Sequence, residues 1–408
     1  MKTRWNRLVK LAVPMLFLLP LMTGCWDRLE IEDRAVVLGV SIDKAGSNTG
    51  SDDVTNNQGT RERLSRDSIR VAVQIALPGR IPLGPGEGGG GTTNSQQTVW
   101  VIDVVGYSLD DAFMRLQQQV SSRIFFGHLR VIIMSEEIAK SGIDNVNDYF
   151  RRNSEVRRMA WLMIAKGEAM PLLKAAPKLE RIPTLYLMST LDEGINMGKF
   201  PQDYIGMFWS NASKKGQEGY LPYVALKKEQ NVEIMGLAYF KGAHMMGKTK
   251  PLQIGGYMAI KGINPAGYRV FVRLSGSSRM VMTSTTHRDT KWKAAIRDGH
   301  PHFMITIVLE VNVEEKLDME FNLHDEGVLR EIQDVESKTA TKMFGRLIRQ
   351  TQEAGSDIFG FGEYIRAKKP GYWNAKVKTK EQWQEQYKEM TFDIKTFVNV
   401  RRVGMEAR

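Results

Sequence analysis

The stretch EGVLREIQDVESKTATKMFGRLIRQTQ, residues 326–352, contains no proline and many residues that favour helices. Because proline removes a backbone donor and breaks a helix, this stretch predicts one long, uninterrupted helix. Segments rich in β-branched and other apolar residues predict strands around it, at 232–240, 268–274, 304–313 and 390–400. Strands first, then a long helix and a last strand predict an α+β domain with a largely antiparallel sheet packed on the helix.

The first half of the chain alternates strand and helix patterns instead. Ser108, with Asp111 three positions later, and Ser135 are typical of helix starts. The expected strands are residues 34–43, 68–77, 97–106, 128–134 and 159–165, and the expected helices are 109–120, 135–140 and 143–152. This order indicates an α/β arrangement. From 172 to 213 the patterns are mostly helical and are broken into short pieces by glycine and proline.

The length of 408 residues exceeds what one core usually organises, so we expect more than one domain. We assign residues 1–24 to a lipoprotein signal peptide, 25–195 to an N-terminal α/β domain, 196–250 to a middle or connecting region and 251–408 to a C-terminal α+β domain. Two stretches of the N-terminal domain, 46–66 and 78–98, consist largely of Gly, Ser, Thr, Asn and Pro. They hold too few apolar residues to bury a core, so we expect mobile loops there.

The first residues have the order of a signal peptide. Basic residues come first, and an apolar run from 11 to 22 without a charge follows them. The run is shorter than the roughly 20 residues of a permanent membrane span. The next residues, Leu21-Met22-Thr23-Gly24-Cys25, resemble a lipobox, whose cysteine accepts a diacylglyceryl group. We therefore expect a covalent diacylglyceryl and N-acyl lipid on Cys25 and no other cofactor; a buried cysteine is the alternative interpretation.

The composition narrows the class of protein. Hydrophobic residues make up 42% and charged residues 25%, as in a globular body that lies outside a bilayer. Cys25 is the only cysteine, so no internal disulfide can form. The formal net charge is +11, and removal of a leader with four basic and no acidic residues lowers it to +7. This charge suits anionic lipid head groups or an acidic partner, whereas nucleic acid is not expected because the basic residues are spread out.

Several segments together resemble one known family. They are residues 25–32, CWDRLEIE, with 35–43, AVVLGVSID; residues 127–133, GHLRVII; residues 150–157, FRRNSEVR; and residues 356–363, SDIFGFGE, followed by Trp373 and Trp383. In this order they resemble the C-subunit lipoproteins of spore nutrient germinant receptors, the Ger(x)C family. The resemblance covers nearly the whole chain after the leader.

The resemblance implies a non-enzymatic subunit of a membrane receptor in endospore-forming bacteria. The subunit would work with two polytopic partners of the receptor's A and B types, on the outer face of the inner spore membrane, with the lipid on Cys25 in that membrane. The complex would couple nutrient sensing to spore germination. For this subunit the resemblance implies a scaffold or signal-coupling role, and whether it binds the nutrient itself stays open.

Two short motifs are candidate contact sites. Phe359-Gly360-Phe361-Gly362 alternates aromatic rings with glycines, which suits either an interface or a plug that closes the core at a helix end. Trp26 and Arg28, next to the lipid site, suit the head-group region of a membrane or the start of the fold. Both interpretations of each motif are open from the sequence.

Patterns for catalysis or metal binding are weak. Residues 84–89, GPGEGG, fit G-x-G-x-x-G, but no helix pattern follows them, so a flexible loop is favoured. His300 and His302 have no third ligand at metal spacing, and neither G-x-S-x-G nor H-E-x-x-H occurs. We therefore expect no catalytic residue and no metal site.

Two other functions fit a lipid-anchored body. A solute-binding lipoprotein that delivers a small ligand to a membrane transporter predicts two α/β lobes around a cleft, which the α+β second half disfavours. A tethered cell-wall hydrolase predicts paired carboxylates or a metal triad in a groove, and the sequence assembles neither.

Overall fold

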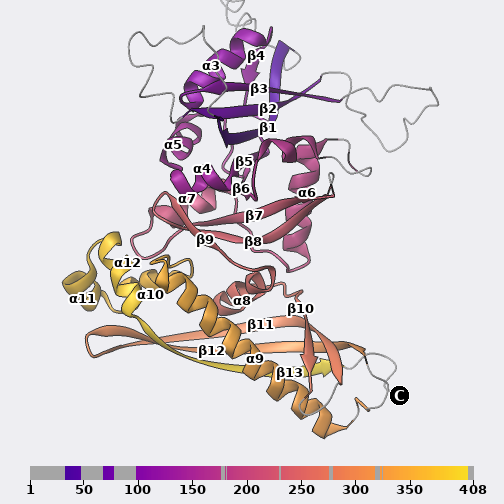
Figure 1. The fold of residues 1–408 in the computed structure, drawn as a ribbon. Helices are drawn as coiled ribbons and strands as arrows, with labels where there is room; N and C mark the ends of the chain where they lie inside the picture. Colours follow the sequence, from indigo (N-terminus) through magenta and orange to yellow (C-terminus); the bar gives the residue numbers. More distant parts are fainter. Residues whose placement is uncertain are drawn as a thin grey trace, which may run out of the picture.

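The computed structural model of the protein describes residues 33–46, 68–77, 98–175, 180, 182–228, 231–274, 279–317, 322–323 and 325–402. These residues build two β-sheets that follow one another along the long axis of the molecule (Figure 1). The prediction of a multidomain α+β protein is confirmed. The leader, Cys25, Trp26, Arg28 and residues 84–89 lie outside the described residues, as do the predicted loops 46–66 and 78–98 apart from Gly46 and Thr98.

The first sheet has nine strands in the order β3-β2-β1-β5-β6-β7-β8-β9, with the short β4 paired to β1. Its strands are β1 Arg34–Lys44, β2 Ile69–Ala76, β3 Val99–Gly106, β4 Arg123–Phe125, β5 Val131–Ser135, β6 Trp161–Ala165, β7 Tyr220–Lys227, β8 Asn231–Lys241 and β9 His244–Lys248. The centre, from β1 through β5 and β6 to β7, is parallel, and both flanks are antiparallel. Every residue of β5 and β6 is buried, as expected for parallel strands covered on both faces.

Helices cover both faces of this sheet. They are α3 Leu109–Gln119, α4 Glu136–Ser141, α5 Asp144–Arg152, η4 Met170–Lys174, α6 Pro183–Asn196 and α7 Ile205–Ser213. Alternate side chains of β5 point to different cores: Ile132 packs with α3, α4, α5 and α7, while Ile133 packs with η4 and α6. Ser108 and Ser135 cap α3 and α4 as predicted, because their hydroxyl oxygens accept N–H groups of the first helical turn.

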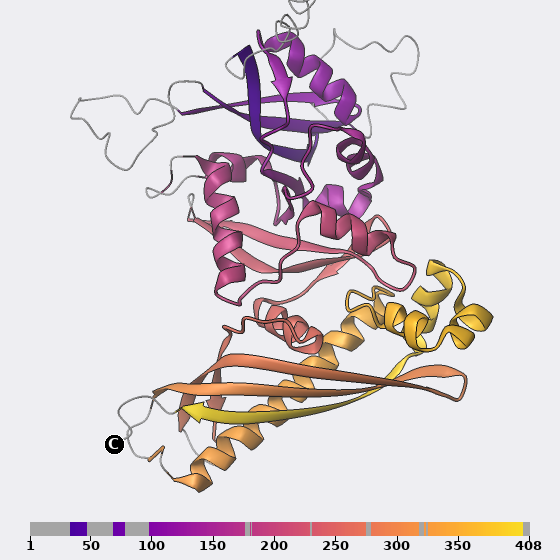
Figure 2. The ribbon, with the colours of Figure 1, turned by 180° about the vertical axis from the view of Figure 1, so that it is seen from behind.

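The second sheet has the order β10-β11-β12-β13. Its strands are β10 Arg269–Arg273, β11 Met280–Arg297, β12 His300–Lys316 and β13 Thr391–Arg402, and its helices are α8 Pro251–Lys261, α9 Glu326–Glu353, α10 Phe361–Lys368, α11 Pro370–Tyr372, η5 Trp373–Val377 and α12 Lys380–Glu389. The long helix α9 crosses one face of the sheet, and α8 lies between the two sheets (Figure 2). The inward side chains of β12, such as Phe303 and Ile307, join the core that reaches into the first sheet.

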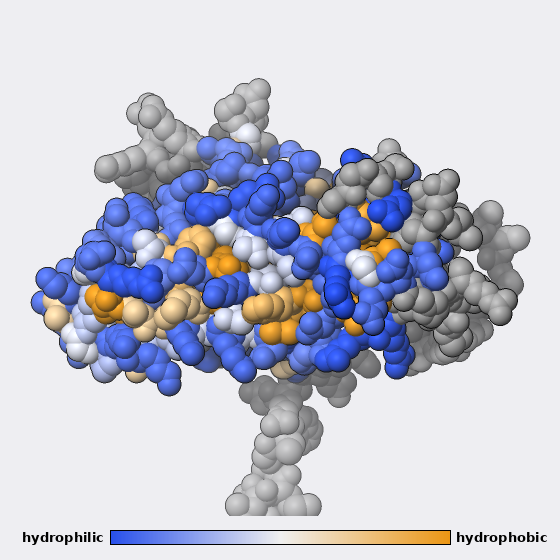
Figure 3. All heavy atoms as spheres, turned by 90° about the horizontal axis from the view of Figure 1, so that it is seen from below, coloured by the Kyte–Doolittle hydropathy of each residue, from blue (hydrophilic) through white to orange (hydrophobic). Residues whose placement is uncertain are grey.

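The other face of the second sheet is open to solvent and mixed in character. Phe271 is 58% exposed and Phe397 is 52% exposed, among charged residues of β11 and β13. Seen from the end of the molecule that carries this sheet, apolar residues form broken patches within a hydrophilic surface (Figure 3). No helix in the described ranges is both long and apolar enough to cross a membrane.

The predicted region 196–250 needs a correction. The region was predicted to connect two domains, but its strands extend the first sheet, because β7 pairs with β6 and β8 pairs with β7. The strand predicted at 232–240 was expected in the second sheet and is instead part of β8. The long strand β11 was not predicted at all, because its exposed face is rich in polar and charged residues. It is held extended by pairing with β12 over nearly its full length and with β10 at its start. The predicted helix 326–352 and last strand 390–400 match α9 and β13 within a few residues.

Candidate functional site: the junction between the two sheets

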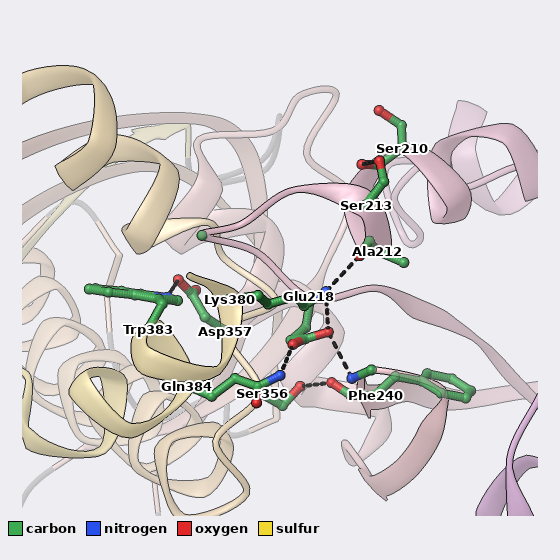
Figure 4. A network of polar contacts seen from close by, with 12 residues as sticks. Ser210, Ala212, Ser213, Glu218, Phe240, Ser356, Asp357, Lys380, Trp383 and Gln384 are labelled. Carbon is green, nitrogen blue, oxygen red and sulfur yellow. Dashed lines mark hydrogen bonds and ion pairs between the residues drawn. The ribbon is translucent and has the colours of Figure 1, made fainter. Parts of the chain in front are cut away.

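Two segments that are far apart in the sequence meet where the two sheets adjoin. One is residues 214–219, KKGQEG, which leads into β7 and is called the entry loop below. The other is residues 356–363, SDIFGFGE, which joins α9 to α10 and is called the junction segment below. Figure 4 shows residues of both segments together with side chains of α12. Apart from Glu363, which is half-buried, every residue of the junction segment is buried.

Asp357 organises the junction segment from inside. Its carboxylate accepts hydrogen bonds from the backbone N–H of Gly360 at 2.8 Å and of Gly362 at 2.9 Å, and from the indole N–H of Trp383 at 3.0 Å. Gly360 has a φ of +82°, which glycine adopts without strain, so the chain can turn around the carboxylate into α10. Burial raises the pKa of Asp357 to about 6, although the three hydrogen bonds act in the opposite direction.

The backbones of the two segments touch directly. The Gly216 N–H donates to Oε1 of Glu363 at 2.8 Å, and the Glu363 N–H donates to the carbonyl of Gly216 at 3.0 Å. A Cβ atom on Gly216 would lie 2.3 Å from the carbonyl carbon of Gly362, and one on Gly362 would lie 2.5 Å from the Trp383 ring. Only glycine fits at both positions, because the atoms in the way are backbone or a buried ring.

A buried ion pair crosses the same junction. Glu218, 2% exposed, pairs with Lys380 of α12 at 2.9 Å, and its carboxylate also accepts from Gln384 Nε2 at 2.6 Å and from the Gly242 N–H at 3.1 Å (Figure 4). The Lys380 ammonium also donates to the carbonyl of Ala212 at 2.6 Å. Each oxygen of Glu218 therefore has a donor, which is the condition under which a buried carboxylate can remain charged.

Main-chain contacts complete the connection. The Glu218 N–H donates to the carbonyl of Asp357 at 2.8 Å, and the Ser356 hydroxyl donates to the carbonyl of Phe240 at 2.5 Å (Figure 4). These bonds join α9 and the junction segment to β8 and to the entry loop of β7. The two sheets are thus held by a network in which charges and backbone groups are paired on both sides.

Aromatic rings fill the space behind this network. Phe359 and Phe361 are fully buried, with centroids 5.3 Å apart; Phe359 stacks on Tyr257 at 5.6 Å, and Phe361 lies 4.7 Å from both Trp292 and Phe303. Lys261 donates to the carbonyl of Phe359 at 2.6 Å, and burial lowers the pKa of this lysine. The rings belong to the same core that runs from the first sheet into the second.

The structure brings together four of the residues singled out from the sequence and leaves others apart. Phe359, Gly360, Phe361 and Gly362 all lie in the junction, buried between the two halves of the chain, so another protein would reach these rings only if the junction opened. An interface role with a partner therefore stays a prediction. His302 contacts Thr391 and Asp393 at the start of β12, and within the described ranges no group of three His, Cys, Asp or Glu side chains is placed to hold a metal.

Sequence reasoning missed the other half of the junction. Gly216, Glu218, Lys380 and Gln384 lie in polar segments with no apolar period, and no motif marks them. The closely spaced glycines of the entry loop, Gly216 and Gly219, are the one available signal, because two glycines beside a buried strand indicate close backbone approach.

Comparison with known proteins finds two family matches that follow one another along the chain. Residues 27–226 match the family described as spore germination protein N-terminal domain, and residues 235–404 match spore germination B3/GerAC like, C-terminal. Two proteins of Bacillus subtilis (strain 168) are similar over nearly their whole length. Spore germination protein KC is 25% identical across 97% of this chain and 96% of its own, and putative spore germination protein YfkR is 27% identical across 97% of both.

A solved structure has the same fold. The crystal structure of the GerBC protein superimposes with a TM-score of 0.55 and 18% sequence identity, covering 82% of this chain and 94% of that one. The two family matches together span most of the described residues. The first ends in β7 and the second begins in β8, so the boundary between them falls inside the first sheet, at the turn that joins these two strands. The chain therefore belongs to the GerAC-like family of spore germination proteins.

Proposed function

We propose that this protein is the lipid-anchored C subunit of a nutrient germinant receptor. It works with two polytopic subunits of the A and B types in the inner spore membrane, and it couples nutrient sensing to spore germination. Its body lies on the outer face of that membrane, held by the diacylglyceryl and N-acyl lipid on Cys25. The observation that carries the proposal is the match of both family domains, in order, over residues 27–226 and 235–404.

The junction supports a coupling role rather than a catalytic one. Its buried ion pair, its paired backbone groups and the contact between Gly216 and Gly362 connect the two sheets at several points. Force or displacement applied to one half is therefore transmitted to the other half without bending a flexible linker. A solute-binding lipoprotein works by opening and closing two lobes, which these fixed contacts oppose.

Export and lipid attachment are proposed from the residues that precede the folded body in the sequence. The leader provides export, and the lipobox ending at Cys25 provides the acceptor thiol. Two or three acyl chains on one cysteine give stable attachment, since each buried methylene contributes about 0.8 kcal/mol. The positive charge of the mature chain adds attraction to anionic lipid head groups.

Co-purification tests the receptor assignment. The full chain carries an affinity tag at its C-terminus, is extracted from spore membranes in mild detergent, and its neighbours are identified by mass spectrometry. Two polytopic receptor-type subunits in near-equal amounts are the expected result. Recovery of the protein alone, or with a transporter permease, would overturn the assignment and favour the solute-binding function.

A cysteine variant tests the anchor separately. Cys25→Ala removes the acceptor thiol, so metabolic labelling with a fatty-acid analogue and membrane retention should both be lost. Thr23→Ser is the matched control, because it keeps a small residue in the lipobox and leaves the thiol in place. Normal membrane retention of Cys25→Ala would show that something other than the lipid holds the protein.

A further inference from the structure

A cavity of about 350 Å³ lies between the second sheet and the helices α8 and α9, away from the junction. It is enclosed by α8, by α9 and by the inner face of β10, β11 and β12, and apolar side chains such as Val272, Leu309 and Phe344 form much of its wall. Its rim includes the exposed residue Arg346, so the space is open to solvent. This volume and this mixture of an apolar wall with a few polar groups are typical of sites for small molecules.

Arg288 enters the cavity because β11 changes its register. Val281, Thr283 and Thr285 point inward at every second position, and a bulge between Thr285 and His287 then turns residue 288 inward instead of residue 287. Bulges often redirect a side chain at a functional site, because the extra residue reverses the alternation. The result is an arginine that is 3% exposed in the middle of a sheet face.

Hydrogen bonds hold the guanidinium of Arg288 in place but involve only part of its donors. Its Nη1 donates to the carbonyls of Ile263 at 2.9 Å and Pro265 at 3.4 Å, and Asn264 bonds both the N–H and the carbonyl of Arg288 at 3.0 and 2.8 Å. Its Nη2 has no hydrogen-bond partner among the described residues. Burial lowers the pKa of Arg288 to about 10, so the group still carries its charge at neutral pH.

Glu336 of α9 lines the same cavity and provides a carboxylate, an acceptor, where Arg288 provides donors. It is 5% exposed, and in the described part of the chain its Oε2 has no hydrogen-bond partner. Burial raises the pKa of Glu336 to about 7, against a hydrogen bond from Thr283. The ion pairs within the described ranges include neither Glu336 nor Arg288, so the two groups do not neutralise each other.

We propose that this cavity binds a small amphipathic carboxylate. The carboxylate of the ligand accepts from Nη2 of Arg288, a hydroxyl or ammonium group of the same molecule donates to Oε2 of Glu336, and an apolar body packs between α8 and α9. Each buried polar atom without a partner is unfavourable, by about 1–3 kcal/mol, so a ligand that pairs both atoms and fills the apolar space gains from three sources at once. The inference goes beyond the receptor role and does not depend on it.

Four probes with one carbon skeleton test the ligand class: leucine, leucate, isocaproate and leucinol. Each is titrated by calorimetry into the full acylated chain in detergent micelles, with empty micelles as the blank. Leucine or leucate should bind most tightly, and the tighter of the two identifies the donor as ammonium or hydroxyl. Leucinol, which lacks the carboxylate, should bind at least about tenfold more weakly, since a site built for a polar group rejects the analogue without it.

Three variants locate the binding. Arg288→Gln should weaken every carboxylate by about tenfold or more, and Glu336→Gln should weaken the tighter donor-bearing probe by about tenfold but isocaproate by less than about twofold. Arg330→Gln is the matched control, because this arginine of α9 is exposed and does not line the cavity, and the affinities of the variant should stay within about twofold of the unmodified chain. Circular dichroism shows whether each variant is folded, and Glu336→Gln keeps the test valid if Arg288→Gln is not.

Two results would overturn the proposal. One is the absence of binding for all three carboxylates, which would mean that water satisfies both groups in solution. The other is that leucinol binds as tightly as the tighter of leucine and leucate, or that this tighter probe binds with unchanged affinity to a folded Glu336→Gln or Arg288→Gln protein. Because the titration uses no partner subunit, its failure would leave the co-purification result unaffected.

Discussion

The junction and the cavity beside α8 and α9 both bury charged side chains, but the hydrogen bonding of these side chains differs. At the junction, Glu218 meets Lys380, Gln384 and a backbone N–H, so its oxygens are paired. In the cavity, Glu336 and Arg288 each keep one polar atom without a partner among the described residues. A fully paired group contributes to a single fixed arrangement, whereas a partly paired group leaves a position that another molecule can complete.

This difference separates a structural role from a binding role within one chain. Buried charge is unfavourable in both places, and the junction offsets it with internal partners at the contact of two domains. The cavity offsets it incompletely, beside open apolar space and a bulge that directs Arg288 inward. Changes at the junction should therefore alter stability, and changes in the cavity should alter binding and pH dependence.

The largest effect is expected from Gly216→Ala. The new Cβ would lie 2.3 Å from backbone of the junction segment, which cannot move aside without separating the sheets. We expect the free energy of unfolding, measured by urea titration, to fall by more than about 4 kcal/mol, or the two halves to lose their contact. Hydrogen exchange of the Glu363 amide, which bonds Gly216, reports that loss directly.

Gly371→Ala is the matched control for this change. Nothing lies within 4 Å of a Cβ at residue 371, so the substitution should alter stability by less than about 0.5 kcal/mol. An equal and small effect at both glycines would contradict the close approach of Gly216 to Gly362.

Glu218→Ala should have the next largest effect. It leaves Lys380, whose side chain is 19% exposed, without its carboxylate, and it removes the acceptor of Gln384 and of the Gly242 N–H. Breaking a buried pair by deleting one partner costs about 3 kcal/mol or more, and the same urea titration measures it.

An exposed ion pair across the same junction provides the comparison. Lys241 of β8 and Glu385 of α12 lie 3.4 Å apart, with Glu385 62% exposed. Glu385→Ala should cost less than about 1 kcal/mol, because water already screens this pair. If both glutamates gave the same loss, burial would not be the reason for the strength of the Glu218 pair.

Helices, strands and caps could be predicted from the sequence better than the contacts between residues that are far apart in it. The helix 326–352 and the serine caps follow from local patterns that need no partner, and all of them are present. Gly216 and Gly362, or Glu218 and Lys380, meet only through the fold, and nothing in their own neighbourhoods specifies the other. The motif 359–362 is visible in the sequence as glycines between aromatic rings, but the spacing of these residues does not predict that they lie between the two halves of one chain.

Glu336→Gln should raise the free energy of unfolding at high pH, whereas the substitutions at the junction lower it. The folded-state pKa of Glu336, about 7, lies above the ordinary value of 4.5, so the folded state binds this proton more tightly than the unfolded state. Its contribution to stability is therefore greatest at low pH and is lost as pH rises from 4.5 to about 7. The shift corresponds to about 3 kcal/mol at most.

The comparison at two pH values makes this test decisive. Near pH 4.5 the variant and the unmodified protein should unfold at similar urea concentrations, and at pH 8 the variant should be the more stable one. Asp357, whose pKa is also raised by burial, adds the same pH dependence to both proteins and cancels in the difference. A variant that is less stable than the unmodified protein at pH 8 would mean that Glu336 is paired after all.

The smallest effect, from Ser356→Ala, tests whether pairing at the junction matters even for a neutral group. The Ser356 hydroxyl is buried and donates to the carbonyl of Phe240 at 2.5 Å, so its removal leaves a carbonyl of β8 with one donor fewer where water cannot replace it. We expect a loss of about 1–2 kcal/mol in the free energy of unfolding. Ser213, whose hydroxyl donates to the carbonyl of Ser210, is near the same junction but exposed (Figure 4). Ser213→Ala removes the same kind of bond in water, so it should cost less than about 0.5 kcal/mol, and equal losses at the two serines would show that burial does not set the strength of the junction.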